Sequence, residues 1–569
     1  GPFPSINARS LLNQTGSMLP STVQSVLATR LAQLSPQARE VAHVAAVIGR
    51  AFSFPVLAQA SGQEEESVVR GLDELWQRRI VREQSAATSE SYDFCHEKLR
   101  EQAYSSLSPV RRRLLHRRVA EAFEAVYARD LESMSGQIAA HYERAGLSEQ
   151  AISYYQRAGA VARRIYANVE AMHSFERAAS LLEDYVVGQR RQNMPWETAA
   201  QVYEAFGDVS TEVGGTQEAT QAYQRAMTYV PVQESIWQAR LQRKMAMTWN
   251  QISENPLNSV LINVRQAFQE AERILTNAAD PSNSAWRREW IRLHFAQIWP
   301  LRWSADEMTA TIEKVQPIVE QYGTQEQRAF LLLAKETRDF IHNGYLGKMP
   351  EHKKALWHAT LDAIQQTGNK SALSGYRIAF GTALWGCGDL DAAASQLEMG
   401  IQIGEQVGIT WLQTRGLTFL PFIYRRRRQV ERVRGILTQA QAIGAMRNNS
   451  VLIGQRAWVA WRDGNLVEAE TYGQASLEAI QLQQVATNLF QCFQWVGVWP
   501  LLGVALVHEQ ISDAISYARL LLDPTQQPPP GEIAALLEAA LAAWDDEKQQ
   551  EARALLRQIV PLAEEMGYL

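Results

Sequence analysis

Residues 384–400 read LWGCGDLDAAASQLEMG, and the order of large and small side chains in this stretch decides the fold. A large residue is followed by a small residue at a turn and then by a small-bulky-small series: Leu384, Gly388, Ala393, Leu397 and Gly400. Small residues where two helices cross let the helices approach closely, and the bulky residue fills the space between them. The stretch therefore predicts two antiparallel helices joined by a tight turn.

The same order recurs along the chain, as expected of a repeat protein. Three further segments match: Tyr142, Gly146, Ala151, Tyr155 and Ala158; Gly207, Gly214, Ala219, Tyr223, Ala226 and Pro231; Ala460, Gly464, Ala469, Gly473 and Ser476. Weaker copies centre on Ala171 (with Phe175 and Ala178), Val433, Ala514 and Ala552. The order is that of tetratricopeptide (TPR) repeats, and the later copies recur at 36 to 45 residues, beyond the usual period of about 34. We expect a right-handed TPR-like α-α superhelix with lengthened helices.

Residues 21–110 follow a different pattern. A helix capped by Ser35-Pro36 and two shorter helices precede two strand-like runs, at 80–83 and 92–95, and a further helix from His96. Helices followed by one hairpin predict a winged-helix domain. Apart from this hairpin we expect the fold to be all-α.

Changes in composition and periodicity predict the domain boundaries. We expect a tag remnant and linker at 1–20, a winged-helix domain at 21–110 and first TPR-like repeats at 111–235. Irregular helical repeats follow at 236–370, TPR-like repeats rich in Trp and Arg at 371–523, and a C-terminal helical repeat at 531–569. The register of the repeats between 235 and 370 stays open. The chain begins Gly1-Pro2 without Met, which resembles the remnant of a cleaved tag, and we expect the natural protein to extend upstream.

Composition excludes several classes of function. The net charge of −5 gives no broad surface for nucleic acid or anionic membrane. Cys95, Cys387 and Cys492 lie far apart and predict neither a disulfide framework nor a zinc site, so a cytoplasmic protein without a metal is expected. No apolar run reaches the length of a membrane span. Catalytic sequence patterns are also absent, so we expect no enzyme activity from this chain.

Four N-terminal stretches resemble one family of bacterial regulators: LPSTV (19–23), LAQLSPQAR (31–39), AVIGRAF (46–52) and YDFCHEKLREQAY (92–104). They are similar to the region after the nucleotide-binding core of STAND proteins, the signal-transduction ATPases with numerous domains typified by the maltose-regulon activator. The resemblance covers about 170 residues and implies a winged helix that closes over ADP, with His96 contacting its phosphate. The alternative is that His96 only caps a helix or lies in a domain interface.

The resemblance also implies an ATPase core that binds ATP or ADP in the full-length protein. This chain contains no GxxxxGK[ST], because Gly347-Lys348 lacks the upstream glycine and the following hydroxyl residue. We therefore expect no cofactor in this chain itself, and the missing nucleotide-binding core becomes its expected partner in cis.

The first helices of the later repeats carry the predicted ligand site. In a TPR array, particular first-helix positions line the concave groove, and the repeat register assigns to it Trp385, Arg415, Phe422, Arg425, Arg426, Trp458, Trp461, Arg462 and Trp499. Arginine pairs with carboxylate or phosphate and tryptophan offers a large flat surface, so the groove suits an anionic or aromatic ligand. The alternative is that several of these tryptophans fill gaps between long helices.

Three functions are compatible with this organisation. The first is the sensor region of a STAND switch, which takes an inducer or a protein partner into the groove. A constitutive protein-binding scaffold is the second. The third, a winged-helix transcription regulator that binds DNA, is disfavoured because the relevant helix starts Gln63-Glu64-Glu65-Glu66 and would bring carboxylates to phosphate.

Overall fold

The computed structural model describes residues 21–84, 91–187, 195–249, 258–301, 305–343, 347–446, 449–487, 493–524 and 526–569. The chain divides into two compact units, residues 1–195 and 196–569. The predicted break after residue 110 falls inside a helix of the first unit, and the predicted break after residue 235 falls inside the second unit. The predicted linker at 1–20 lies outside the described residues.

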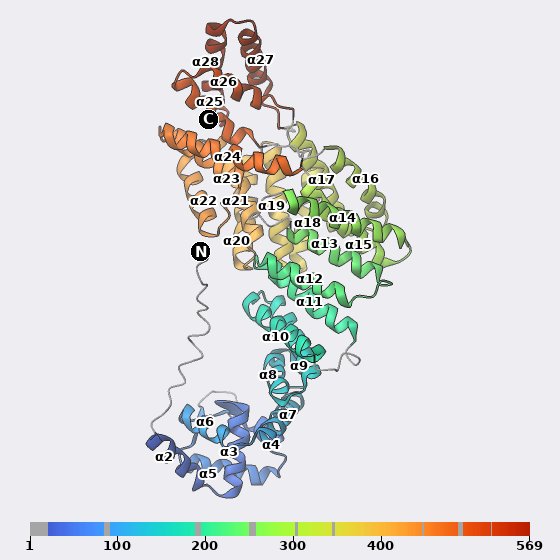
Figure 1. Cartoon of the computed structure of the whole chain (residues 1–569), viewed down its shortest axis with the longest axis vertical. Helices are drawn as coiled ribbons and strands as arrows, with labels where there is room; N and C mark the ends of the chain where they lie inside the picture. Colours follow the sequence, from blue (N-terminus) through green and yellow to red (C-terminus); the bar gives the residue numbers. More distant parts are fainter. Residues whose placement is uncertain are drawn as a thin grey trace. The chain divides into compact units, whose positions relative to one another are not determined.

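The first unit opens with helices around a small sheet (Figure 1). Its first elements are α2 (Ser21–Ala32), α3 (Pro36–Ile48), β1 (Ala51–Ser53), α4 (Phe54–Ser61), α5 (Glu65–Gln77), β2 (Val81–Gln84), β3 (Ser91–Phe94) and α6 (Glu97–Ser105). The predicted hairpin is confirmed to within one residue at each end. The strand β1 was not expected, and it pairs antiparallel with the far edge of β3 to give the order β1-β3-β2. Assignment of this arrangement to the winged-helix class stays a prediction.

Local sequence explains where these elements begin and what they bury. The Ser35 hydroxyl accepts a hydrogen bond from the amide of Ala38, and Pro36 needs no donor at the first position of α3. The sheet contributes Phe52 and Phe94, whose rings lie 6.0 Å apart in an edge-on contact, to the core of the unit. The predicted N-terminal cap of α3 is thereby confirmed.

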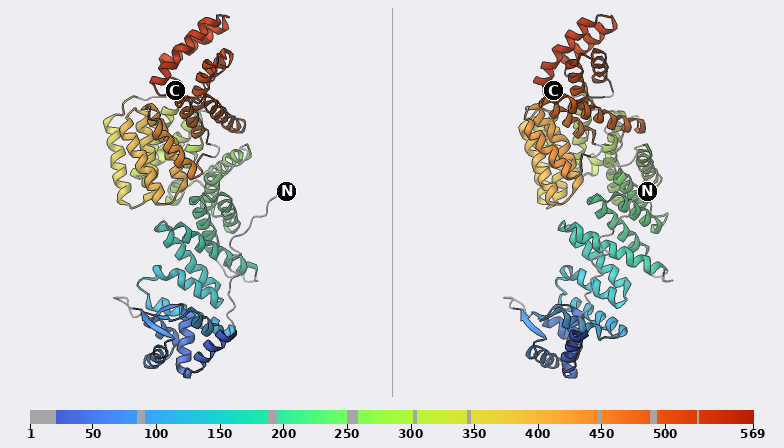
Figure 2. Two further views of the ribbon diagram at one scale, coloured as in Figure 1. Left: turned by 90° about the vertical axis from the view of Figure 1, so that its left-hand side faces the viewer. Right: turned by 60° about the vertical axis from the view of Figure 1, so that its left-hand side comes forward.

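Helical hairpins follow in both units (Figure 2). The first unit continues with α7 (Pro109–Val126), α8 (Leu131–Ala145), α9 (Ser148–Arg164) and α10 (Asn168–Val187). The second unit begins with α11 (Trp196–Glu212), α12 (Thr216–Tyr229), α13 (Ser235–Trp249), α14 (Asn258–Asn277), α15 (Ser284–Leu301), α16 (Ala305–Tyr322), α17 (Gln325–Asn343) and α18 (Glu351–Gln366). The described part of the stretch between residues 235 and 370, which sequence could not register, contains the helices α13 to α18.

The Trp- and Arg-rich repeats and the C-terminal helices complete the second unit. They are α19 (Lys370–Gly386), α20 (Leu390–Gln406), α21 (Thr410–Arg426), α22 (Val430–Ala442), α23 (Ser450–Arg462), α24 (Leu466–Thr487), α25 (Trp495–Val507), α26 (Ile511–Leu521), α27 (Gly531–Asp545) and α28 (Gln549–Glu565). In each hairpin the first helix packs on the second, and the first helices α19, α21, α23 and α25 also contact one another in sequence order. The expected TPR-like arrangement with long helices is confirmed.

A close helix crossing shows why the repeats need small residues. On α11, a Cβ atom at Gly207 would lie 2.6 Å from the ring of Tyr223 on α12, well inside van der Waals contact. Glycine therefore makes room for the aromatic side chain that fills the hairpin. The glycines predicted at the turns have positive φ, between 74° and 86°: Gly146, Gly214, Gly388 and Gly464.

Candidate functional site

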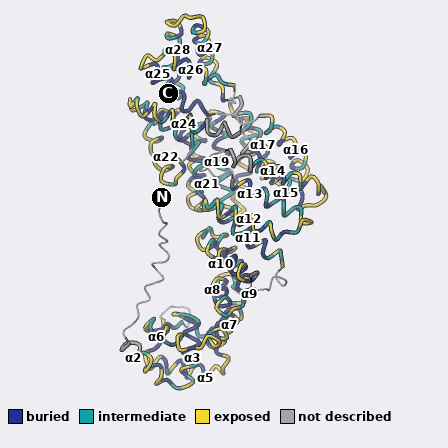
Figure 3. Tube along the Cα trace, in the orientation of Figure 1, coloured by how far each residue is buried: buried dark blue, intermediate teal, exposed yellow. Residues whose placement is uncertain are grey.

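The predicted groove residues lie on the first helices α21, α23 and α25, apart from Trp385 on α19. Two of them, Arg425 and Trp499, contact the last residues of the sequence, Met566 to Leu569, which we call the C-terminal segment. Arg425, Trp495 and Trp499 contact this segment, and Gln455 and Trp458 contact Arg425; we call these five residues the Arg425 cluster. The tube coloured by burial shows α25 as largely buried (Figure 3).

Arg425 holds the C-terminal segment through its backbone. Its Nε donates to the carbonyl of Gly567 at 2.9 Å, and its Nη2 donates to the carbonyl of Tyr568. The remaining nitrogen, Nη1, donates to the side-chain oxygen of Gln455 at 3.3 Å. The guanidinium also lies over two indole rings, with centroids 5.5 Å away for Trp458 and 5.3 Å for Trp495. One arginine thus joins the segment to α23 and α25.

The charge of Arg425 is compensated only by neutral groups. The side chain is 1% exposed, and burial lowers the pKa of its guanidinium to about 9. In the described ranges, no Asp or Glu side chain pairs with it; its acceptors are two backbone carbonyls and one amide oxygen. A buried cation without a counterion is costly, so this position favours an anionic group.

Unsatisfied donors lie on three residues of the Arg425 cluster. Three buried N–H groups have no hydrogen-bond partner among the described residues: Trp458 Nε1, Trp499 Nε1 and Gln455 Nε2. All three side chains are 0% exposed. Native proteins pair most buried polar groups, and those left over mark functional sites often enough to deserve an explanation. Unpaired hydrogen-bond donors therefore remain in the described part of the Arg425 cluster, which again favours a ligand rich in hydrogen-bond acceptors.

Aromatic side chains extend the cluster toward α19. Trp385 stacks on Phe422 with ring centroids 4.7 Å apart, and Phe422 lies 5.3 Å from Phe493 and 5.5 Å from Trp495. Trp495 then meets Tyr568 edge-on at 4.9 Å. The rings form one continuous set from α19 to the C-terminal segment. Such surfaces supply large contact areas at interfaces.

The predicted site residues differ in accessibility. Phe422, Arg425, Trp458 and Trp499 are buried, Trp385, Arg415, Trp461 and Arg462 are half-buried, and Arg426 is exposed. Arg462 contacts the end of α28 through Glu564, at 3.5 Å. Their assignment to a ligand groove stays a prediction, and the sequence did not indicate that the C-terminal segment lies against Arg425 and Trp499. The groove prediction also missed Gln455, Phe493, Trp495 and Tyr568.

His96 lies apart from any ligand-like arrangement. It is exposed at the N-cap position of α6, where its side chain makes no capping hydrogen bond. Of the two alternative roles, helix capping is contradicted by the structure, and a position in a domain interface stays a prediction. The proposed contact with nucleotide requires the core outside this chain and stays a prediction.

A chain of hydrogen bonds in the first unit joins α6, α7 and α8. The Tyr104 hydroxyl lies 2.9 Å from His116 Nε2, and His116 Nδ1 lies 2.9 Å from His141 Nδ1. Burial lowers the pKa of His116 to about 4 and that of His141 to about 3. Both rings are therefore neutral at pH 7. The two contacts are satisfied with the donors running either from the tyrosine toward His141 or from His141 toward the tyrosine.

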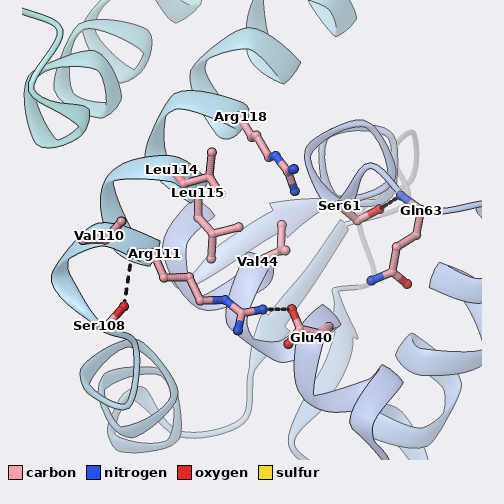
Figure 4. Close-up of a pocket in the computed structure, with 10 residues that line it drawn as sticks. All are labelled: Glu40, Val44, Ser61, Gln63, Ser108, Val110, Arg111, Leu114, Leu115 and Arg118. Carbon is pink, nitrogen blue, oxygen red and sulfur yellow. Dashed lines mark hydrogen bonds and ion pairs between the residues drawn. The ribbon is translucent and has the colours of Figure 1, made fainter.

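The first unit also has a pocket of about 320 Å³ between α3, the end of α4 and the start of α7. Its floor is apolar, with Val44 and Leu115, and the Arg118 side chain extends toward it (Figure 4). Arg111 pairs with Glu40 at its edge, and the Ser61 hydroxyl accepts from the amide of Gln63. Because these polar groups pair with each other, the pocket offers less unmet bonding capacity than the Arg425 cluster.

In the described ranges, no group of three or more His, Cys, Asp or Glu side chains is arranged to hold a metal ion. Within the same ranges, every helix is too short or too polar to span a bilayer. The Arg425 cluster is thus the strongest candidate site.

The similarity of this chain to known proteins is limited. No protein-family model matches the chain. An uncharacterized protein of Rhizobium meliloti is 31% identical over 162 residues, which is 28% of this chain and 16% of that protein. The match thus spans about a sixth of that relative's length.

Two solved structures are similar over most of the chain. A STAND protein with a tetratricopeptide repeat sensor from Pyrococcus horikoshii aligns with 80% of this chain and 66% of its own length, at 11% identity and a TM-score of 0.45. A Rap protein complexed with Competence and Sporulation Factor aligns with 66% of this chain and 98% of its own, at 11% identity and a TM-score of 0.42. These similarities concern only the fold. The chain's own helical hairpins describe a TPR-like repeat array with a small three-stranded sheet near its N-terminus.

Proposed function

We propose that this chain is a regulatory region that binds a peptide or protein partner on the face formed by the first helices α19, α21, α23 and α25. The observation that supports this proposal most strongly is the Arg425 cluster. It already binds a peptide segment by the means that peptide-binding proteins use, which are hydrogen bonds to the backbone and aromatic contacts to a side chain.

The wider role we propose is that of the sensor in a STAND-type ATPase. Binding would change the balance between two states of the nucleotide core, which lies outside this chain and would bind ATP or ADP. To shift that balance, the partner must bind one state better than the other, by several kcal/mol for a near-complete switch. The N-terminal sequence resemblance, including His96, supports this role.

Selection of peptides on the purified chain tests the binding proposal. A displayed peptide library is selected against the chain, and each binder is measured by fluorescence anisotropy against wild type, Arg426→Glu and the control Arg292→Glu. Arg426 is exposed at the end of α21, whereas Arg292 is exposed on α15, away from the proposed face. We expect at least about tenfold weaker binding for Arg426→Glu alone, because the reversed charge repels an acidic peptide.

The same binders locate the site by hydrogen exchange. Protection on α21, α23 and α25 supports the proposed face. Binders that instead protect only the second helices α20, α22 and α24, and that tolerate Arg426→Glu, would show that the chain acts as a scaffold through its other face.

A further inference from the structure

The C-terminal segment caps the end of α28, where the amides of Tyr568 and Leu569 donate to the carbonyl of Ala563, and it also lies against α21. Two successive carbonyls, of Gly567 and Tyr568, accept from one guanidinium, and the Tyr568 ring packs 4.9 Å from Trp495 and 5.7 Å from Trp499. The backbone also comes very close to α21. A Cβ atom at Gly567 would lie 2.7 Å from the Cα of Arg426, and the φ of Gly567 is 76°. Glycine is thus required at this point.

The segment satisfies this site incompletely. It supplies neutral carbonyl oxygens to a buried guanidinium, and the indole N–H groups of Trp458 and Trp499 have no acceptor in the part of the chain that the structure describes. Charged acceptors form shorter and stronger hydrogen bonds with arginine than carbonyls do, and they can accept from both arms of its fork. A carboxylate at the position of the Tyr568 carbonyl would therefore fit the site better than the segment does.

We propose that the Arg425 cluster binds the free C terminus of a peptide that ends in an aromatic residue, and that residues 566–569 occupy this site until such a peptide displaces them. The aromatic ring of the incoming peptide replaces that of Tyr568 against Trp495 and Trp499, and its terminal carboxylate meets Arg425. This inference rests on the proposed function. It adds the chemical class of the ligand, and it adds that residues 566–569 block the site when no ligand is bound.

A ligand that must displace the segment binds with reduced apparent affinity. The peptide pays for release of the segment, so its apparent affinity for the wild-type chain is reduced by the fraction of molecules in which the site is open. Loosening the segment must therefore strengthen binding. The chain offers a matched pair of variants for this purpose.

Gly567→Ala loosens the segment, because the added methyl group would collide with the backbone of α21. Gly464→Ala is the control, since its φ of 74° imposes similar backbone strain and no atom lies within 4 Å of the added Cβ. Tyr568→Ala is a second loosened variant that keeps the backbone of the segment. Circular dichroism and thermal unfolding establish that each variant is folded before binding is measured.

The probes are synthetic peptides labelled at the N terminus. The first, AEEMGY, has the sequence of residues 563–568 and ends in a free carboxylate at Tyr568. A second carries a C-terminal amide, a third replaces the tyrosine by alanine, and a fourth is an amide with aspartate after the tyrosine. The fourth distinguishes a side-chain carboxylate from a terminal one.

We expect the free acid to bind Gly567→Ala and Tyr568→Ala at least about tenfold more tightly than wild type or Gly464→Ala. We also expect it to bind at least about tenfold more tightly than the amide or the alanine peptide. Equal binding to loosened and wild-type chains would overturn the competition by the segment. Equal binding of acid and amide, or preference for the aspartate peptide, would overturn the ligand class. In either case, selected peptides that still protect α21 and α25 leave the proposed function intact, whereas no binding of any peptide to that face refutes both.

Discussion

Replacing Arg425 by methionine tests how the C-terminal segment is held. Methionine has a similar length and no charge, so it retains part of the packing and removes the hydrogen bonds to the carbonyls of Gly567 and Tyr568. Hydrogen bonds to a charged group contribute about 1.5 to 3 kcal/mol each, and loss of the buried charge offsets part of that. We expect the free energy of opening the segment to fall by about 3 kcal/mol, which is roughly a hundredfold.

Native-state hydrogen exchange measures this opening. The amides of Tyr568 and Leu569 both donate to the carbonyl of Ala563, so they exchange only when the segment opens. The control is Arg519→Met, which removes an exposed ion pair with Asp545 and should change exchange by less than about 0.5 kcal/mol. Exchange at the two segment amides that stays within twofold of wild type in the Arg425 variant would refute the role assigned to this arginine.

Two further predictions concern the repeats and the first unit. Gly207→Ala should destabilise the second unit by about 1 to 3 kcal/mol, because the added methyl group collides with Tyr223. Gly435→Ala should stabilise the unit by about 0.5 to 1 kcal/mol, because the helix surface is open at that position. Urea unfolding of the two variants and wild type measures both effects. The lowered pKa values of His116 and His141 mean that the unfolded chain binds more protons below pH 6.5, so their stabilisation is complete above pH 6.5 and is lost as the pH falls toward 4. Between pH 6.5 and pH 5 the free energy of unfolding should fall by about 2 kcal/mol for each histidine, and this loss should be smaller in His116→Gln. A urea unfolding midpoint that does not change with pH over that range would contradict this prediction.

Local sequence patterns predicted most of the repeat architecture. The small-bulky-small series at Ala393, Leu397 and Gly400 identified a hairpin because close helix crossing restricts side-chain size within a few turns. Local sequence also predicted that Ser35 caps the N terminus of α3. The three-residue strand β1 was missed, because so short a run has too little alternation to be distinguished from a turn.

The closed state of the site could not be predicted in this way. Arg425 and Gly567 are separated by 142 positions, and no periodicity within a repeat indicates that the end of the chain folds back to α21. Trp495 was missed because α25 is almost uniformly apolar and lacks a clear repeat register. Some of the residues assigned to the groove do lie together, such as Arg425 with Trp458 and Trp385 with Phe422, since first-helix positions in successive repeats share one face.

Hydrogen exchange of the wild-type chain with saturating AEEMGY free acid tests the central claim most directly. The account predicts that the amides of Tyr568 and Leu569 lose their protection when the peptide binds, while α21 and α25 remain protected. A bound peptide that leaves the protection of both segment amides unchanged would contradict the claim that the C-terminal segment and the ligand share one site.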